Sequence, residues 1–252
     1  MRSLLIALTF LTRIPLPNPS EVTQEEFTRS QHYYPFVGFL LGGILWGALI
    51  LLLPLYPPLV IGALLLILQL ILTGGIHLDG FMDSMDGLLS ARTPERMLEI
   101  MKDSRVGAFG AISSIGLLLL KFALFTELLT LENSPAPLFI LFMPLLARWI
   151  FLIGVYYFPY ARSNGLGKGF HETSRQTKGF FISQGVFLVL LTFWVLDWAG
   201  IVGFLTSTLF ISFFTYKSSR LLGGLTGDLY GASIEFAELI FLLGAFPLIL
   251  NS

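Results

Sequence analysis

Long apolar runs alternate with short polar segments along the chain, and this pattern predicts a membrane protein. Each run approaches the roughly 20 residues that cross a bilayer, and each must be helical because lipid cannot satisfy open backbone. The sequence therefore predicts an all-α polytopic bundle of about seven spans, forming one integral membrane domain over residues 1–252. The runs lie near 36–56, 58–76, 107–126, 137–158, 180–197, 199–217 and 234–250.

Residues 1–11 form a shorter apolar segment. Arg13 and three prolines follow it, without the small-x-small cleavage site of a signal peptide. We therefore expect a short helix lying at the membrane interface. Within the first span, Gly38, Gly42, Gly43 and Gly47 give two small-xxx-small pairs, a pattern that suits close helix packing.

The composition supports the membrane assignment. The chain is 55% hydrophobic and 12% charged, with a mean hydropathy of +0.80, whereas a soluble domain carries roughly twice that charge. The net charge of −1 argues against a nucleic-acid partner. Because the chain has no cysteine, thiolate nucleophiles and sulfur-bound metals are excluded.

The basic residues predict the orientation. Thirteen of the fifteen lie before the first span or in the three long polar segments on the same side; the other two, Lys121 and Arg148, lie within spans. Segments on the opposite side carry acids and no bases. The positive-inside rule therefore predicts that the amino terminus and the three long loops lie in the cytoplasm. The thirteen are Arg2, Arg13, Arg29, Arg92, Arg96, Lys102, Arg105, Arg162, Lys168, Arg175, Lys178, Lys217 and Arg220.

An acidic segment directly after the second apolar run carries the clearest chemistry. Asp79, Asp83 and Asp86 are spaced i, i+4, i+7, so on a helix they share one face, and no basic residue lies between them. Clustered oxygen ligands without cationic partners favour Mg²⁺. His77 would point away from this face on an unbroken helix, unless the neighbouring glycines bend the chain; a general base and a satisfied interfacial histidine both remain open.

Two further segments carry candidate phosphate ligands. Thr93 before Pro94 and Glu95 predicts a surface helix over 94–102. The guanidinium groups of Arg92 and Arg105 could grip phosphate, or could serve only as topology signals. The glycines at 165, 167 and 169 could let backbone amides approach phosphate, although the segment is no P-loop.

A glycine-rich turn over 223–231, containing Thr226 and Asp228, is predicted on the same side as the acidic segment. Glu235 and Glu238 follow it at the start of the last span. They are either part of a site or structural partners of Arg148, and the sequence leaves that choice open.

Six motifs in order along the chain resemble the cobalamin synthase family, also called adenosylcobinamide-GDP ribazoletransferases. The resemblance runs nearly end to end. The motifs are Phe10-Leu11-Thr12-Arg13-Ile14-Pro15, Tyr34-Pro35-Phe36-Val37-Gly38, the segment 74–87, Asp103-Ser104-Arg105-Val106-Gly107, Pro159-Tyr160-Ala161-Arg162 and Gly223-Gly224-Leu225-Thr226-Gly227-Asp228.

The resemblance implies a Mg²⁺-dependent transferase of vitamin B12 biosynthesis that is integral to the cytoplasmic (inner) membrane. Such an enzyme joins α-ribazole, or its 5′-phosphate, to adenosylcobinamide-GDP and releases GMP, so its partners are these two substrates and the lipid bilayer. On this hypothesis Asp79, Asp83 and Asp86 hold Mg²⁺, and His77 or an aspartate takes the hydroxyl proton. The candidate substrate-binding residues are Arg92, Arg105, Arg162, Thr226 and Asp228. Self-association is left open.

Two other functions remain as alternatives. A CDP-alcohol phosphotransferase carries D-x-x-D-G-x-x-A-R, but the segment 83–92 has one residue too many before Ala-Arg, and the later aspartates are missing. A transporter would use Arg148, Lys121 and the aspartates to line a pathway. Against a transporter, the carboxylates cluster at one membrane face and no repeat is evident.

Overall fold

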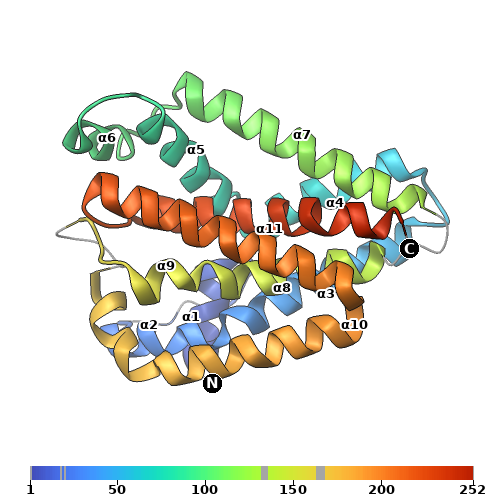
Figure 1. The fold of residues 1–252 in the computed structure, drawn as a ribbon, viewed down its shortest axis with the longest axis horizontal. Helices are drawn as coiled ribbons and strands as arrows, with labels where there is room; N and C mark the ends of the chain where they lie inside the picture. The colour runs from blue at the N-terminus through green and yellow to red at the C-terminus, as the bar shows by residue number, and fades with distance from the viewer. Residues whose placement is uncertain (1, 18, 20, 132–135, 163–167, 252) are drawn as a thin grey trace.

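The chain folds as an all-helical bundle (Figure 1). The computed structural model describes residues 2–17, 19, 21–131, 136–162 and 168–251, except for the side chains of 136 and 168–176. The only β-type pairing in this part of the chain is a single bridge between Tyr160 and Leu225. The helices are α1 (Arg2–Leu11), α2 (Gln24–Ser30), α3 (Tyr34–Leu52), α4 (Pro58–Thr73), α5 (Ile76–Leu88), α6 (Pro94–Ile100), α7 (Ala108–Thr130), α8 (Ala136–Ile150), α9 (Leu152–Tyr157), α10 (Lys168–Leu222) and α11 (Gly227–Ile249), with a 3₁₀ turn at Gln31–Tyr33.

Within the described residues, five helices are long and apolar enough to cross a membrane, or six if α4 and α5 together form one bent span. One of the five, Thr177–Leu222, has a break at Asp197, whose backbone is not helical (φ 53°, ψ −152°). Figure 1 shows its two limbs running back along each other. Both limbs touch Trp149, because the rings of Phe181 and Phe204 lie 4.7 and 5.6 Å from its ring, although a straight helix would separate them by about 34 Å. Counted separately, the limbs bring the total to the predicted seven.

The second span differs from its prediction. The run 58–76 was expected to end in water, but α4 stops at Thr73 and α5 leaves it at an angle of 91°. Gly74 and Gly75 make the bend with φ of 63° and 68°, values that glycine adopts without strain. In Figure 1, α5 runs from the middle of the bundle to one end. The acidic segment therefore begins inside the bundle rather than beyond it.

Other boundaries shift by smaller amounts. The predicted span 137–158 is divided at Phe151 into α8 and α9. The last span begins at 227 rather than 234, because the Thr226 side chain accepts a hydrogen bond from the Leu229 backbone N–H and caps α11. Thr93 caps α6 in the same way, as predicted.

The close helix packing predicted from two glycine pairs in α3 is confirmed for one of the pairs. A Cβ at Gly38 or Gly42 would lie 2.3 or 2.0 Å from a backbone oxygen of α8, whereas Gly43 and Gly47 have nothing within 4 Å. The first pair therefore sets how closely α3 approaches α8.

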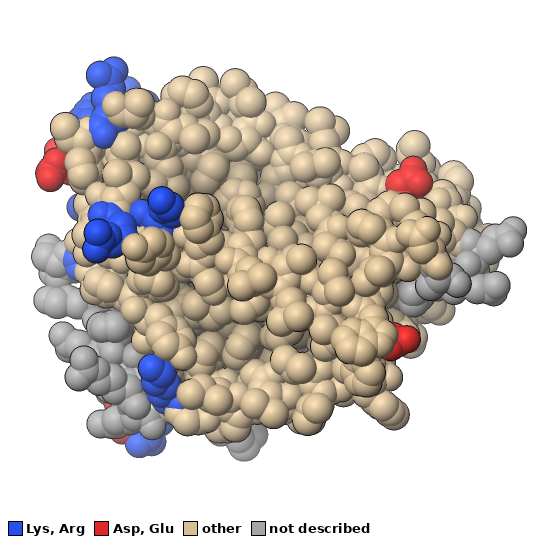
Figure 2. All heavy atoms as spheres, in the orientation of Figure 1, with Lys and Arg blue, Asp and Glu red and all other residues tan. Residues whose placement is uncertain are grey.

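Charge is distributed unevenly over the surface. Figure 2 shows Lys and Arg side chains gathered at one end of the bundle, the end where α6 lies. Figure 2 shows few charged side chains between the two ends, and the exposed surface includes large apolar side chains such as Trp194 (83% exposed) and Leu51 (73%). An exposed apolar belt with one charged end is typical of a bundle embedded in lipid. α1, predicted to lie at the interface, runs across the direction of the long helices and buries Ile6, Ala7 and Leu11.

Candidate active site

α5 and α11 cross closely at the charged end of the bundle. A Cβ at Gly80 of α5 would lie 3.0 Å from the Asp228 carbonyl oxygen, and one at Gly231 of α11 would lie 3.1 Å from the carbonyl of His77. This contact brings the first turn of α11 against the acidic segment. Asp228, in that turn, thereby becomes a neighbour of the acids on α5.

Asp79, Asp83 and Asp228 form an acidic cluster at this crossing. The carboxylate of half-buried Asp83 is repelled by Asp79, Asp228 and Asp86, and Asp228 is repelled by Asp79 in turn. The sequence predicted that Asp79, Asp83 and Asp86 share one helix face, and it placed Asp228 only on the same side of the membrane. The structure brings Asp228 into the group.

Asp86 has a different environment from the acidic cluster. It is 7% exposed, and its two carboxylate oxygens accept hydrogen bonds from the backbone N–H groups of Gly107 and Gly110, both at 2.8 Å. These N–H groups belong to the unpaired first turn of α7. Asp86 therefore anchors the amino terminus of α7 to α5.

Arg162 provides a positive charge at the acidic cluster. Its guanidinium lies 2.6 Å from the Asp228 carboxylate, and Thr226 donates a 3.3 Å hydrogen bond to the same carboxylate. Two backbone hydrogen bonds of 2.8 Å, between Ala161 and Leu225 and between Leu225 and Pro159, fix the segment carrying Arg162 beside α11. The candidates Arg162, Thr226 and Asp228 are therefore in direct contact.

Arg92 and Arg105 are not in this contact network. Arg92 is exposed in the turn before α6. Arg105 pairs with Asp103 at 2.6 Å in an exposed loop, and its hydrogen bonds lower the pKa of Asp103 to about 2. The glycines expected to approach phosphate at 165 and 167 lie outside the described residues.

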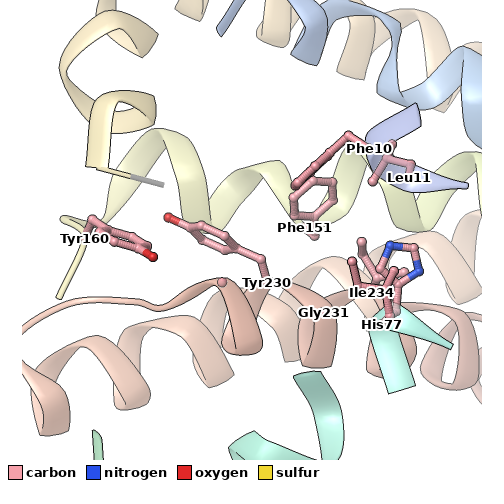
Figure 3. A pocket seen from close by; sticks show the side chains of 10 residues that line it. Phe10, Leu11, His77, Phe151, Tyr160, Tyr230, Gly231 and Ile234 are labelled. Carbon is pink, nitrogen blue, oxygen red and sulfur yellow. The ribbon is translucent and has the colours of Figure 1, made fainter. Parts of the chain in front are cut away.

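His77 lies on the other side of α5, buried at 5% exposure. Its Nδ1 is 3.4 Å from a guanidinium nitrogen of Arg148. It borders a cavity of about 240 Å³ whose other lining residues include Phe10, Phe151, Tyr160, Tyr230 and Ile234 (Figure 3). The direction predicted for an unbroken helix, away from the aspartates, is thus the one observed.

Glu235 and Glu238 form a buried ion network rather than part of the acidic cluster. Lys121 Nζ lies 2.5 Å from Glu235 and 2.7 Å from Glu238. Arg148 and the Gln69 side-chain amide also donate hydrogen bonds to Glu238. All four charged side chains are at most 6% exposed. Glu238 therefore pairs with Arg148, as one of the two alternatives expected, whereas Glu235 pairs with Lys121 instead.

Tyr160 joins the cavity to the acidic cluster, a link that the sequence did not reveal. Burial raises the pKa of its phenol, so the group keeps its proton at neutral pH and can donate it to a ligand. In the sequence, the position of Tyr160 beside Arg162 in the motif 159–162 could have indicated that it belongs to the site. Nothing in the sequence indicated this for Phe10 and Phe151, because buried aromatic residues are ordinary in a membrane bundle.

Comparison with known proteins gives the family. A family model described as cobalamin-5-phosphate synthase matches residues 3–246. The chain belongs to the cobalamin-5-phosphate synthase family. The match covers the acidic cluster, the cavity and the ion network alike.

Several members of the cobalamin-5-phosphate synthase family resemble the chain along nearly its whole length. A protein of Desulfitobacterium hafniense (strain Y51), named adenosylcobinamide-GDP ribazoletransferase, is 72% identical over 249 residues, covering 99% of this chain and 98% of its own. Proteins of the same name from Brevibacillus brevis and Alkaliphilus oremlandii are 38% and 35% identical, covering 96% and 98% of this chain and 97% and 98% of their own. No solved structure matches the chain.

Proposed function

We propose that this chain is an adenosylcobinamide-GDP ribazoletransferase, which joins ribazole or its 5′-phosphate to the cobinamide phosphate and releases GMP. The observation that carries the proposal is the 72% identity, over nearly the whole of both chains, to a relative of that name. The acidic cluster supplies side chains suited to the chemistry. Self-association is not part of the proposal.

The reaction is a phosphoryl transfer. A ribose hydroxyl of the acceptor forms a bond to the phosphorus next to cobinamide, the phosphoanhydride bond to GMP breaks, and GMP leaves with the electron pair. The hydroxyl proton passes to a base, which we assign to a carboxylate of the acidic cluster. Such transfers depend mainly on positioning and on neutralising phosphate charge.

Asp79, Asp83 and Asp228 would hold Mg²⁺ together with the diphosphate. Their oxygen atoms are the donors that Mg²⁺ prefers, and their mutual repulsion is relieved by a cation. Among the described residues, no three His, Asp or Glu side chains lie so that they could hold a metal ion by themselves. A finished cage is not required, since Mg²⁺ usually takes one or two carboxylates and completes its shell with water and substrate phosphate. When bound, the ion supplies charge neutralisation and alignment of the diphosphate.

Arg162 would hold a phosphate oxygen at the edge of the acidic cluster. A guanidinium presents several donors in a fixed plane and suits phosphate. Arg162 pairs with Asp228 at 2.6 Å, with both side chains no more than 20% exposed. We assign Asp86 to anchoring α7, because both of its oxygens already accept backbone hydrogen bonds.

The charged end of the bundle is proposed to face the cytoplasm of the inner membrane. The gathering of Lys and Arg at that end supports this orientation (Figure 2). The carboxyl terminus lies at the opposite end in Figure 1. A reporter enzyme active only outside the cytoplasm should therefore be active when fused to Ser252. An inactive fusion would indicate the opposite orientation.

Nucleotide release tests the activity. Purified protein in lipid nanodiscs, given adenosylcobinamide-GDP and ribazole, should release GMP in step with cobalamin formation. The activity should disappear with EDTA and return with Mg²⁺. Release of CMP from a CDP-activated lipid would favour the CDP-alcohol phosphotransferase alternative. Uptake of either substrate into sealed vesicles without product would favour a transporter.

A further inference from the structure

The cavity next to the acidic cluster has the size of one aromatic ring system. Its volume is about 240 Å³, half as large again as the cavity of about 150 Å³ that holds benzene in an engineered protein. Ligand sites for larger molecules start at about 300 Å³. The cavity therefore suits a two-ring aromatic group but is too small for a whole nucleotide or a corrinoid.

The lining of the cavity is aromatic. Phe10 comes from α1, Phe151 from the break between α8 and α9, and Tyr230 from α11, with Tyr160 nearest the acidic cluster. Figure 3 shows these residues spread from Tyr160 and Tyr230 at one end to His77 and Ile234 at the other. Aromatic walls contact a flat apolar ring in stacked or edge-on geometry.

His77 supplies a polar group with a fixed direction. Arginine can only donate, so the imidazole Nδ1 facing Arg148 must be the acceptor of their contact. The neutral ring therefore carries its proton on Nε2. Arg148 is held by Glu238 in turn. The ion network thus fixes His77 as a hydrogen-bond donor on the cavity wall.

The cavity leads to the acidic cluster. Tyr160 and Gly227 line it, and each lies beside a member of the Arg162–Asp228 pair: Arg162 follows Tyr160 by two residues and Asp228 follows Gly227 directly. A ring bound against His77 would leave its sugar at Tyr160, within reach of the acids. The arrangement matches an acceptor whose aromatic base is buried and whose hydroxyl reacts.

We infer that this cavity binds the aromatic base of ribazole, and that the His77 Nε2–H donates a hydrogen bond to the free ring nitrogen of that base. This inference rests on the proposed function and gives the acceptor its binding site. His77 is then a positioning residue for the acceptor rather than the general base. The corrinoid stays outside the cavity.

Filling the cavity tests the inference. Ile76 lines it and is 39% exposed, so Ile76→Phe adds bulk at a tolerant position. In nanodiscs it should weaken ribazole binding, measured by calorimetry, about tenfold or more, and leave adenosylcobinamide-GDP binding within about twofold. The matched control is Ile71→Phe, on the exposed face of α4 (65%), which should change neither. Unchanged ribazole binding in a folded Ile76→Phe protein would overturn the site.

The hydrogen bond is tested with a ligand pair. Ribazole is compared with its indole analogue, in which the free ring nitrogen is replaced by C–H. Wild type should bind the analogue about 3- to 10-fold more weakly. His77→Leu should bind both alike, and His77→Gln, which keeps a donor, should recover part of the difference.

Equal binding of the two ligands by wild type would overturn the role of His77 without any variant, even if His77→Leu fails to fold. A ligand preference that persists in folded His77→Leu would overturn it too. These measurements use ribazole binding alone. GMP release by wild type tests the proposed function separately, so failure of the binding site and failure of the proposed function can be distinguished.

Discussion

Two groups of charged side chains meet α11, and they differ in how their charges are balanced. In the ion network, Lys121 and Arg148 face Glu235 and Glu238, so two positive charges meet two negative ones in full burial. In the acidic cluster, Asp79, Asp83 and Asp228 face Arg162 and are only partly covered. Removing one partner of a balanced buried pair strands a charge and is strongly destabilising, whereas excess charge near the surface is typical of a ligand site.

The largest expected effect comes from unbalancing the ion network. Lys121→Met leaves Glu235 buried without its cation, and removing one partner of a buried pair costs about 3–5 kcal/mol. We expect a correspondingly lower thermal midpoint for the protein in detergent. Adding Glu235→Gln to Lys121→Met removes the stranded charge and should recover much of the loss. No recovery would mean that packing, not charge, makes Lys121 important.

Neutralising an acid of the acidic cluster should lower turnover and leave the stability of the fold unchanged. Asp83→Asn removes a charge that its neighbours oppose, so the folded protein should keep its thermal midpoint. Loss of one charge-stabilising group at a reacting centre costs about 10²–10³-fold in turnover. GMP release, measured over a Mg²⁺ titration, should show that loss. Near-normal turnover at ordinary Mg²⁺ would remove Asp83 from the metal site.

Asp86 gives an intermediate case that separates anchoring from catalysis. Asp86→Ala strips the acceptors from the Gly107 and Gly110 N–H groups, and loss of such a cap costs about 1–2 kcal/mol. Asp86→Asn keeps one oxygen acceptor, so it should retain more stability and most of the activity. If Asp86→Asn instead matched Asp83→Asn in lost turnover at unchanged stability, Asp86 would be a metal ligand.

The smallest effect is expected at Arg105, whose pairing with Asp103 is exposed. Hydrogen bonds from Arg105 lower the pKa of Asp103 from 3.8 to about 2. The ion pair is therefore fully present above the ordinary pKa of 3.8, and it is lost only as the pH falls through about 2. Because an exposed ion pair contributes little to stability, Arg105→Ala should leave the thermal midpoint nearly unchanged between pH 5 and 8. A large rise in KM for adenosylcobinamide-GDP would instead show that Arg105 binds phosphate.

The helical class and six of the spans followed from hydropathy, since lipid enforces long apolar helices. The acidic helix also followed, from spacing alone. The angle after Thr73 did not, because glycine permits a turn without specifying its direction. Nor could spacing predict that Asp228 would meet Asp83, since that contact depends on how α5 crosses α11. Nor could spacing predict the 3.4 Å contact of His77 with Arg148, since that contact joins α5 to α8.

The bend at Gly74 and Gly75 has a consequence for the surrounding lipid. α4 has 16 residues, about 24 Å of helix, which is shorter than the roughly 30 Å hydrocarbon layer. The more polar α5 continues from α4 to the charged end of the bundle (Figure 1), and we expect the bilayer to be thinner beside it. Such thinning would bring water and soluble substrates to the carboxylates of α5. Turnover in vesicles should accordingly fall as the acyl chains of the lipid are lengthened.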